Sequence, residues 1–191
     1  MLDRQQMRQL KIEPPDQAVY KEVRGNWDAL AKPLDGMGEF EELFARIGAI
    51  RRDPSLDISR KAVVVMCADN GIVEENISQS GQDVALAAIE IGMELAKRLA
   101  HEGYKLLATG EMGIGNTTTS SAVAAALLSC DPKEITGKGA GLSDTALLRK
   151  IAVVEEGIQM HELYQADAFD VLCAVGGLDI AGLSGVFIGG A

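Results

Sequence analysis

The chain has 191 residues, of which 47% are hydrophobic and only 4% are aromatic. This length and this composition fit one domain in which helices pack on a parallel sheet, and they exclude a collagen and disfavour an aromatic-rich β-sandwich. The net charge of −10 argues against nucleic acid as a partner, because neutralising phosphates requires clustered Lys and Arg.

The sequence carries no sign of a membrane segment. No apolar run reaches the roughly 20 residues that span a bilayer, and the polar opening MLDRQQMRQLK lacks the apolar core of a signal peptide. We therefore expect a cytoplasmic protein. Three cysteines and two histidines are scattered without metal-ligand spacing, so we expect core thiols, surface histidines, no metal site and no cofactor.

The first part of the chain is polar and irregular. Pro14, Pro15 and Pro33 interrupt it, and Trp27 and Leu30 are the apolar side chains of one short expected helix. We predict an N-terminal arm over residues 1–38 that lies on a core domain over residues 39–191.

An amphipathic helix follows over Glu39 to Ile50, with its apolar residues on one face, and it is expected to pack on the domain. The run AVVVMCA, Ala62 to Ala68, is typical of a strand covered on both faces. It ends at Asp69-Asn70-Gly71, where open α/β folds place their ligands. Taken alone, these residues favour ordinary turn chemistry before Gly71 over a ligand site, and both interpretations of Asp69 and Asn70 stay open.

The rest of the chain alternates between helical and strand-like segments. Helices are predicted over residues 84–102, 117–129 and 145–164, and strands over residues 105–109 and 171–175, with Gly176 and Gly177 ending the last of these. The closing LDIAGLSGVFIGGA is predicted to be a short helix and a further strand. The order strand, glycine turn, helix predicts an α/β fold with a mostly parallel sheet and flanking helices.

The most informative segment is GEMGIGNTTTSS, Gly110 to Ser121. Glycines let a backbone approach a ligand closely, and the N-terminus of the following helix favours an anion such as phosphate. A glycine turn before a helix is also common without any ligand. The segment fits neither the Walker A pattern nor GxGxxG, and the chain has no GxSxG nucleophile elbow.

Four stretches carry a family resemblance: VVVMCADNGIVEENISQSGQ, LLATGEMGIGNTTTSSAV, TGKGAGLSD and AVGGLDIAGLSGVFIGGA. They resemble the nicotinate-nucleotide:dimethylbenzimidazole phosphoribosyltransferases, which attach the lower-ligand base of cobalamin to ribose phosphate. WDALAKPLDGMGEFEEL resembles a divergent copy of the family's entry segment. The resemblance implies a Rossmann-like α/β fold, a homodimer, and transfer of phosphoribose from nicotinate mononucleotide to a benzimidazole base.

The resemblance also implies site residues. Glu111 would face the reacting centre, and Lys138 would be a cation beside the nucleotide phosphate. Ser78, Ser80 and Gln82 would line the base pocket. The remaining implied substrate-binding residues are Asp69, Asn70, Met112, Gly113, Ile114, Gly115, Asn116, Thr117, Gly176 and Gly177.

Elementary chemistry agrees with a carboxylate at this site. Substitution at an anomeric carbon develops positive charge on the sugar, and the incoming imidazole must lose a proton, so both steps favour Glu or Asp. Two simpler explanations stay open: Glu111 as a partner of a helix dipole, and Lys138 as a solvated loop charge.

Two departures from the family pattern are visible. The family continues after SGQ through a further strand and a long loop, whereas here Ala87 follows Gln82 almost at once. Family members also extend well beyond GVFIGGA, and the resemblance places the family's general-base glutamate in that absent part. An inactive shortened chain, a non-catalytic module that binds a nucleotide phosphate, and a structural subunit are therefore alternatives to the transferase.

Overall fold

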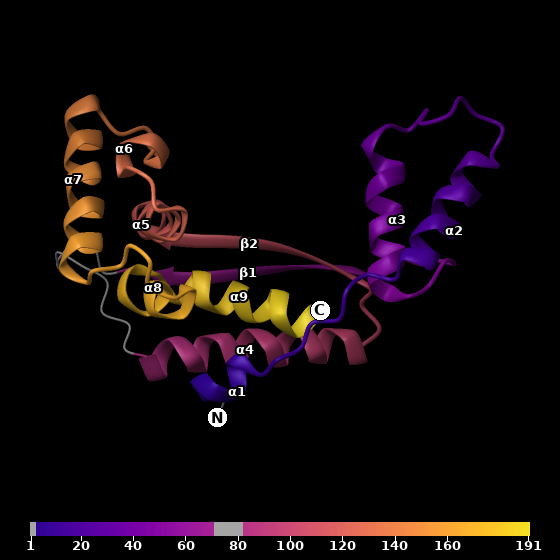
Figure 1. The fold of residues 1–191 in the computed structure, drawn as a ribbon, viewed down its shortest axis with the longest axis horizontal. Coiled ribbons are helices and arrows are strands. Elements are labelled where there is room, and N and C mark those ends of the chain that lie inside the picture. Colours follow the sequence, from indigo (N-terminus) through magenta and orange to yellow (C-terminus); the bar gives the residue numbers. More distant parts are fainter. Residues whose placement is uncertain (1–2, 71–81) are drawn as a thin grey trace.

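A two-stranded parallel sheet lies at the centre of the computed structural model, which describes residues 3–70 and 82–191 (Figure 1). Strand β1 (Lys61–Asp69) pairs with β2 (Leu106–Ile114), and helix α4 (Gln82–His101) precedes β2 in the chain. The register runs from Lys61 opposite Leu106 to Asp69 opposite Ile114. Both strands therefore end at the same edge of the sheet.

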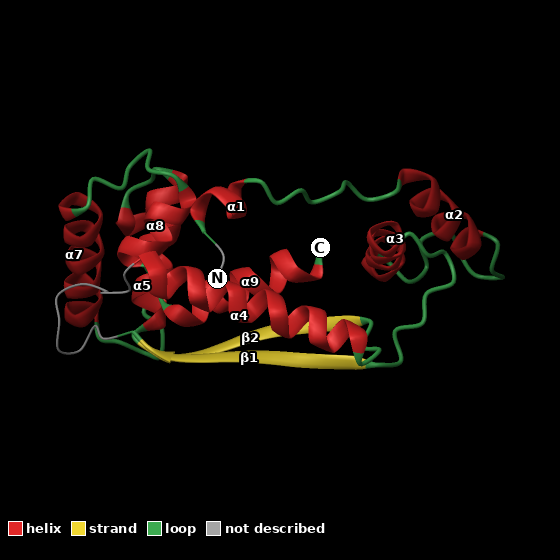
Figure 2. Ribbon diagram, turned by 90° about the horizontal axis from the view of Figure 1, so that it is seen from below, coloured by secondary structure: helices red, strands yellow, loops and turns green. Residues whose placement is uncertain are grey.

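Helices α4 and α9 (Leu178–Gly190) cover one face of this sheet, as Figure 2 shows. Val64 of β1 contributes to a buried cluster with Ala96 of α4 and Val186 of α9. Alternate residues of β1 point the other way, and Val63 is 69% exposed there. The strand was predicted to be covered on both faces, and this prediction is wrong within the described part of the chain. Cys67, expected in the core, is exposed for the same reason.

Glycines bring α4 and α9 close together. A Cβ atom on Gly185 would overlap the backbone carbonyl of Ile89, and one on Gly92 would overlap that of Gly182. On Gly189 it would lie 2.6 Å from the Cα atom of Met93. The two helices therefore pack backbone to backbone, which explains why a glycine-rich segment is helical here despite the low helix propensity of glycine.

A second group of helices packs at the carboxyl end of the strands. It comprises α5 (Asn116–Leu128), α6 (Pro132–Ile135), α7 (Asp144–Met160) and α8 (Ala168–Val175). Ala125 of α5, Ile158 of α7 and Val171 of α8 are completely buried in one cluster. The small side chains of α5 allow this close approach. Among the helices of the described residues, none is long and apolar enough to cross a membrane.

The secondary-structure predictions failed near the C-terminus of the chain. Residues 171–175 were predicted to be a strand but belong to α8, and the expected last strand is part of α9. Asp167 starts α8 by accepting hydrogen bonds from the backbone amides of Phe169 and Asp170. The helix is buried on two sides, so its apolar run has no amphipathic period to distinguish it from a strand.

Strand β2 is longer than predicted and includes Gly113 and Ile114. Pairing with β1 holds these residues extended, so the turn before α5 is made by Gly115 alone, at a φ of 81°. A positive φ of this kind favours glycine.

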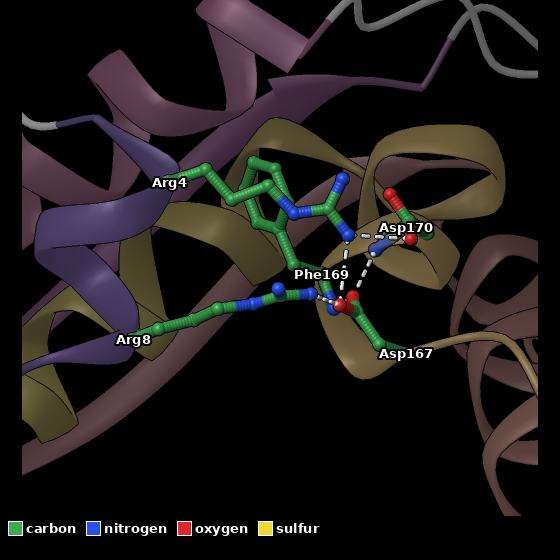
Figure 3. A network of polar contacts seen from close by, with 5 residues as sticks. All are labelled: Arg4, Arg8, Asp167, Phe169 and Asp170. Atoms are coloured by element: carbon green, nitrogen blue, oxygen red, sulfur yellow. Dashed lines mark hydrogen bonds and ion pairs between the residues drawn. The ribbon is translucent and has the colours of Figure 1, made fainter.

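The N-terminus is fixed to α8 by charge. Arg4 of α1 (Arg4–Arg8) donates hydrogen bonds to Asp167 at 2.7 Å and to Asp170 at 2.5 Å, and it stacks on the ring of Phe169 (Figure 3). Arg8 also pairs with Asp167. These contacts keep the pKa of the Asp167 carboxyl well below its usual value, mainly through the backbone hydrogen bond from Asp170 and the bond from Arg4.

Helices α2 (Gln17–Asp28) and α3 (Glu39–Arg51) form a hairpin to one side of the sheet (Figure 1). Glu41 is completely buried and pairs with Lys32 at 2.9 Å and with Arg24 at 3.5 Å. The bond from Lys32 lowers the pKa of Glu41. The predicted helix over residues 39–50 is confirmed, but its apolar face is largely exposed. The division at residue 38 stays a prediction.

The packing of α4 on α9 predicts that Gly185→Ala destabilises the protein by about 1–3 kcal/mol, because the new methyl group meets the backbone of α4. Gly25→Ala is the matched control. It adds the same methyl group to α2, where nothing lies within 4 Å, and should stabilise by about 0.5–1 kcal/mol. Urea unfolding midpoints measure both effects. Equal effects of the two changes would contradict the backbone-to-backbone packing.

The charged contacts of α1 predict that Asp167→Ala speeds trypsin cleavage after Arg8, since the arm loses its main acceptor. Asp131→Ala is the control, because Asp131 caps α6 through Lys133 but does not contact the arm. Because the pKa of Asp167 is lower in the folded protein than in the unfolded chain, acid removes the stability that this carboxylate contributes. The stability that Asp167 adds is complete above its unfolded-state pKa of about 4 and is lost as the pH falls further. An arm equally protected in both variants would contradict this role.

Candidate active site

The candidate site lies where both strands end and α5 begins. The backbone amide of Asn70, the residue after β1, donates to the carbonyl of Ile114 at 3.3 Å. Gly115 then starts α5 without a side-chain cap. The first amides of a helix have no acceptor within the helix, and they form a positive end that attracts anions. The sequence-predicted residues Gly115, Asn116 and Thr117 are all at this position.

A buried ammonium group lies beside this helix end. Lys150 of α7 is only 7% exposed, and its Nζ donates to the Oγ1 atom of Thr117 at 3.0 Å and to the carbonyl of Gly137 at 2.9 Å. Burial lowers the pKa of Lys150. Within residues 3–70 and 82–191, no carboxylate forms an ion pair with it. A buried cation is costly without a counter-charge, so this position is suited to an anion.

The second glycine loop reaches the same point through its backbone. Gly139 has a φ of +57°, and a Cβ atom there would lie 3.0 Å from the Oγ1 atom of Thr117 and 3.7 Å from Nζ of Lys150. Lys138, the cation expected from the resemblance, instead forms a salt bridge with Asp144 at 2.6 Å, and both side chains are more than half exposed. The loop thus supplies backbone to the site, and α7 supplies the cation.

Glu111 is held in place by the first residue of α5. The side-chain amide of Asn116 donates to the Oε2 atom of Glu111, and Asn116 itself is almost fully buried. Glu111 remains exposed. A carboxylate is therefore fixed near the end of β2, beside the positive end of α5. This geometry is compatible with both roles considered for Glu111, a partner of the helix dipole and a carboxylate that takes part in the reaction.

A layer of buried polar side chains supports the site from beneath. Thr119 donates to Asn70 Oδ1 at 3.2 Å, and a Cβ atom on Gly113 would lie 2.8 Å from both Asn70 Nδ2 and Asp179 Oδ2. Asp179, in the first turn of α9, is only 1% exposed. A side chain at Gly177 would overlap both Asn70 and Asp179. Gly113 and Gly177 are therefore packed against protein atoms, and Gly176 lies in the same connection between α8 and α9.

The structure separates some of the predicted residues from this group. The side chains of Met112 and Ile114 are exposed and point to the uncovered face of the sheet. Asp69 ends β1 and is exposed. Ser78 and Ser80 lie outside the described residues. Gln82 is the first residue of α4, and its side chain is not among those described. Within the described ranges, no group of three or more His, Cys, Asp or Glu side chains could hold a metal ion.

Sequence reasoning missed Lys150, Thr119 and Asp179. A signal for Lys150 exists: it falls between Leu147 and Val154 on the buried stripe of an amphipathic helix, where a lysine is unusual. Asp179 follows two glycines at a helix start, which is common for structural reasons alone. Thr119 is one of several hydroxyl residues in sequence, and only the structure distinguishes it.

Sequence comparison identifies the family. A family model described as "Phosphoribosyltransferase" matches residues 12–87 and 81–191. The nicotinate-nucleotide–dimethylbenzimidazole phosphoribosyltransferase of Acetivibrio thermocellus is 34% identical, with 91% of this chain and 69% of that protein covered. That of Clostridium acetobutylicum is 33% identical, with 92% and 68% covered. The chain thus spans about two thirds of the length of these relatives.

The matches also locate the absent internal block. The match to the Acetivibrio protein extends over 241 residues, whereas 91% of this chain is about 174 residues. About 67 positions of the relative therefore have no counterpart within the matched region. The two segments of the family match meet at residues 81–87, which agrees with the break expected after Gln82.

Solved structures give the same result. CobT from Thermus thermophilus superposes with a TM-score of 0.77 at 27% identity, covering 91% of this chain and 71% of that one. A second structure, the nicotinate-nucleotide-dimethylbenzimidazole phosphoribosyltransferase of the same organism, has a TM-score of 0.74 at 27% identity, covering 92% and 71%. The predicted Rossmann-like α/β class is confirmed. The chain belongs to the phosphoribosyltransferase family that includes the nicotinate-nucleotide–dimethylbenzimidazole enzymes.

Proposed function

We propose that this chain binds nicotinate mononucleotide with its phosphate at the N-terminus of α5 and transfers the phosphoribose to 5,6-dimethylbenzimidazole. The products are α-ribazole 5′-phosphate and nicotinate, as in cobalamin biosynthesis. The observation that carries the proposal is the buried Lys150 ammonium, which has no carboxylate partner in the described part of the chain and donates to Thr117. A nucleotide phosphate would supply the missing counter-charge.

The electrostatics favour a monophosphate at this position. The ammonium of Lys150, the hydroxyl of Thr117 and the first amides of α5 are all donors, and they converge from two helices. Charge-assisted bonds to phosphate are stronger than bonds between neutral groups. Burial lowers the pKa of Lys150, and a bound phosphate would raise it again. Phosphate binding therefore favours protonation of Lys150, and protonation of Lys150 favours phosphate binding.

The reaction requires one bond to form and one to break at the anomeric carbon. A ring nitrogen of the benzimidazole bonds to C1′, the bond from C1′ to the pyridine nitrogen of nicotinate breaks, and the N–H proton of the base is released. Glu111 is the proposed catalytic carboxylate. Since Asn116 holds its Oε2 atom, the carboxylate lies ready to stabilise positive charge on the sugar or to accept that proton.

The base pocket is proposed to include Ser78, Ser80 and Gln82, as the resemblance implies. Asp69, Asn70 and Met112 remain proposed as substrate-binding residues, with the glycines 113, 115, 176 and 177 and with Ile114. A homodimer and a cytoplasmic location are part of the same proposal. The binding-only module is less favoured, because the family match and the named relatives are transferases.

Lys150→Met is expected to weaken binding of nicotinate mononucleotide by roughly 30-fold or more, since removing one partner of a buried charge pair costs at least about 2 kcal/mol. Lys138→Met removes the same charge from an exposed position on the neighbouring loop and should change the affinity less than about twofold. Isothermal titration calorimetry measures both. Urea unfolding serves as the folding control, because methionine fits the space of the lysine stem.

If the Lys138 variant bound the nucleotide more weakly than the Lys150 variant, Lys150 would not be the phosphate-binding cation. Lys138, the cation that the resemblance implies, would then take that role. No binding by the unmodified chain would contradict the phosphate site itself.

Transfer is tested by mixing the chain with nicotinate mononucleotide and dimethylbenzimidazole and measuring α-ribazole phosphate by mass spectrometry. We expect product, and we expect Glu111→Gln to lower kcat roughly 100-fold with little change in nucleotide affinity. Glu102→Gln, at the end of α4, is the control and should leave kcat unchanged. Saturable nucleotide binding without any product would instead assign the chain to the binding-only class.

A further inference from the structure

The face of the sheet that points away from α4 and α9 is apolar, and no other described residue covers it. Val63 and Val65 of β1 are 69% and 53% exposed, and Met112 and Ile114 of β2 are 70% and 68% exposed. The register places these four side chains on one face of the sheet. Figure 2 shows both helices on the same side of the strands, so this face is left open.

The outer edge of β1 has backbone groups that point away from β2. The amide of Asn70 donates to the carbonyl of Ile114 at 3.3 Å, and the carbonyl of Arg60 accepts from the amide of Lys105 at 2.9 Å. The even-numbered residues of β1 therefore direct their backbone groups toward β2. Since successive residues of a strand direct these groups to opposite sides, the odd-numbered residues direct theirs to the outer edge. The sheet of the described residues has two strands, so no third strand pairs with this edge.

The block that this chain lacks is long enough to complete the sheet. About 67 positions of the Acetivibrio protein have no counterpart here, and the two segments of the family match meet at residues 81–87, between β1 and β2 in chain order. A strand–helix–strand unit takes roughly 30 residues or more. The block can therefore form one helix and one strand with their connections. Parallel sheets are normally covered on both faces, and here one face is covered.

The handedness of strand connections gives the place of that helix and that strand. Connections between parallel strands are right-handed almost without exception. Crossovers that run in opposite directions across a sheet therefore place their helices on opposite faces. Helix α4 lies on one face and leads to β2. A new strand at the outer edge of β1 lies in the opposite direction, so a helix that connects β1 to it lies on the uncovered face.

We propose that the uncovered face and the outer edge of β1, together the open sheet surface, bind a separate polypeptide that supplies an amphipathic helix and a parallel strand. Its helix packs on Val63, Val65 and Met112, and its strand pairs with the odd-numbered residues of β1. The partner thus has the chemistry of the absent block and supplies it from another chain.

The combination of face and edge selects a polypeptide. A lipid or a small apolar molecule would cover Val63 and Val65 but would leave the N–H and C=O groups of the outer edge without protein partners. Another strand satisfies these groups, and a helix beside it buries the side chains. Between Lys61 and Asp69, at the two ends of β1, the face carries no charged side chain, so the contacting side of the helix is apolar.

A synthetic peptide tests the docking. It carries the roughly 67 positions of the Acetivibrio protein that this chain lacks, and isothermal titration calorimetry measures its binding to the whole chain. We expect saturable binding of one peptide per chain, and no binding of a peptide with the same composition in scrambled order. If neither peptide binds, or if both bind equally well, the proposal is wrong.

The uncovered face is tested by Val63→Glu, which should weaken binding of the peptide at least roughly 30-fold, because docking would bury an unpaired carboxylate. Val63 is 69% exposed in the chain alone, so this variant should fold normally. Leu148→Glu is the matched control, at a leucine of α7 that is 68% exposed, and should change the affinity less than about twofold. Circular dichroism verifies both folds. Equal affinities of the two variants would exclude this face.

The outer edge of β1 is tested by Val65→Pro, which removes an N–H group that points away from β2 and should weaken binding roughly tenfold or more. Thr109→Pro is the matched control. The carbonyl of Ile114 points to β1, so the N–H group of Thr109, five residues earlier, points to the outer edge of β2. Weaker binding in the Thr109 variant than in the Val65 variant would place the strand at the wrong edge and contradict the derived topology.

Amide hydrogen exchange tests the same edge in the unmodified chain. The amides of Val63, Val65 and Cys67 should exchange fast in the chain alone and at least about tenfold more slowly with the peptide bound. The amides of Val64 and Met66 bond to β2 and should be protected in both states. If the peptide binds without slowing the odd-numbered amides, the strand does not pair with β1.

Sedimentation velocity of the chain alone tests the alternative occupant. If the unmodified chain associates with itself and Val63→Glu abolishes that association, a second copy covers the open sheet surface and the proposed partner is wrong. None of these measurements uses a nucleotide. Their outcome is therefore independent of the proposed transferase activity.

Discussion

The register of β1 and β2 is the constraint on which the candidate site depends. Because Asp69 lies opposite Ile114, both strands end together, and the residues that follow them meet at one edge. Asn70 bonds across this edge to Ile114, and Gly115, the next residue of the chain, is the N-cap of α5. A shift of one residue would turn Glu111 to the uncovered face and remove it from Asn116.

The parts that sequence predicted well are those with a strong local signal. The run AVVVMCA is a strand, and the helices over residues 39–51, 82–101, 116–128 and 144–160 follow clear patterns. Residues 168–175 were missed because a short apolar run buried on two sides has no diagnostic period, and only the cap at Asp167 marks it as a helix. The site was predicted by its glycine turn, but its cation was not. The loop of Lys138 approaches Thr117 with the backbone of Gly139, whereas Lys150 contacts Thr117 from the next helix, and such a contact depends on tertiary packing.

The absent internal block divides the site into two halves. The break in the family match lies at residues 81–87, at the start of α4 and after the residues that the resemblance assigns to the base pocket. The phosphate half, at α5 and α7, is held by contacts within the described residues. The glycine contacts of α4 with α9 also lie beyond the break. We therefore expect nucleotide binding to depend less on the missing block than binding of the base does.

Two buried charged side chains in this chain differ in whether neighbouring residues neutralise them. Glu41 is fully buried, but Lys32 and Arg24 surround it, so its charge is neutralised within the hairpin. Lys150 is almost as deeply buried, yet its two acceptors are a hydroxyl and a carbonyl, which solvate the ammonium without neutralising it. A protein could remove this cost by placing a carboxylate nearby, and the described residues place none there. The cost is instead offset when an anion binds. Lys150 contacts Thr117 at the start of α5, where the glycine turn leaves the backbone open.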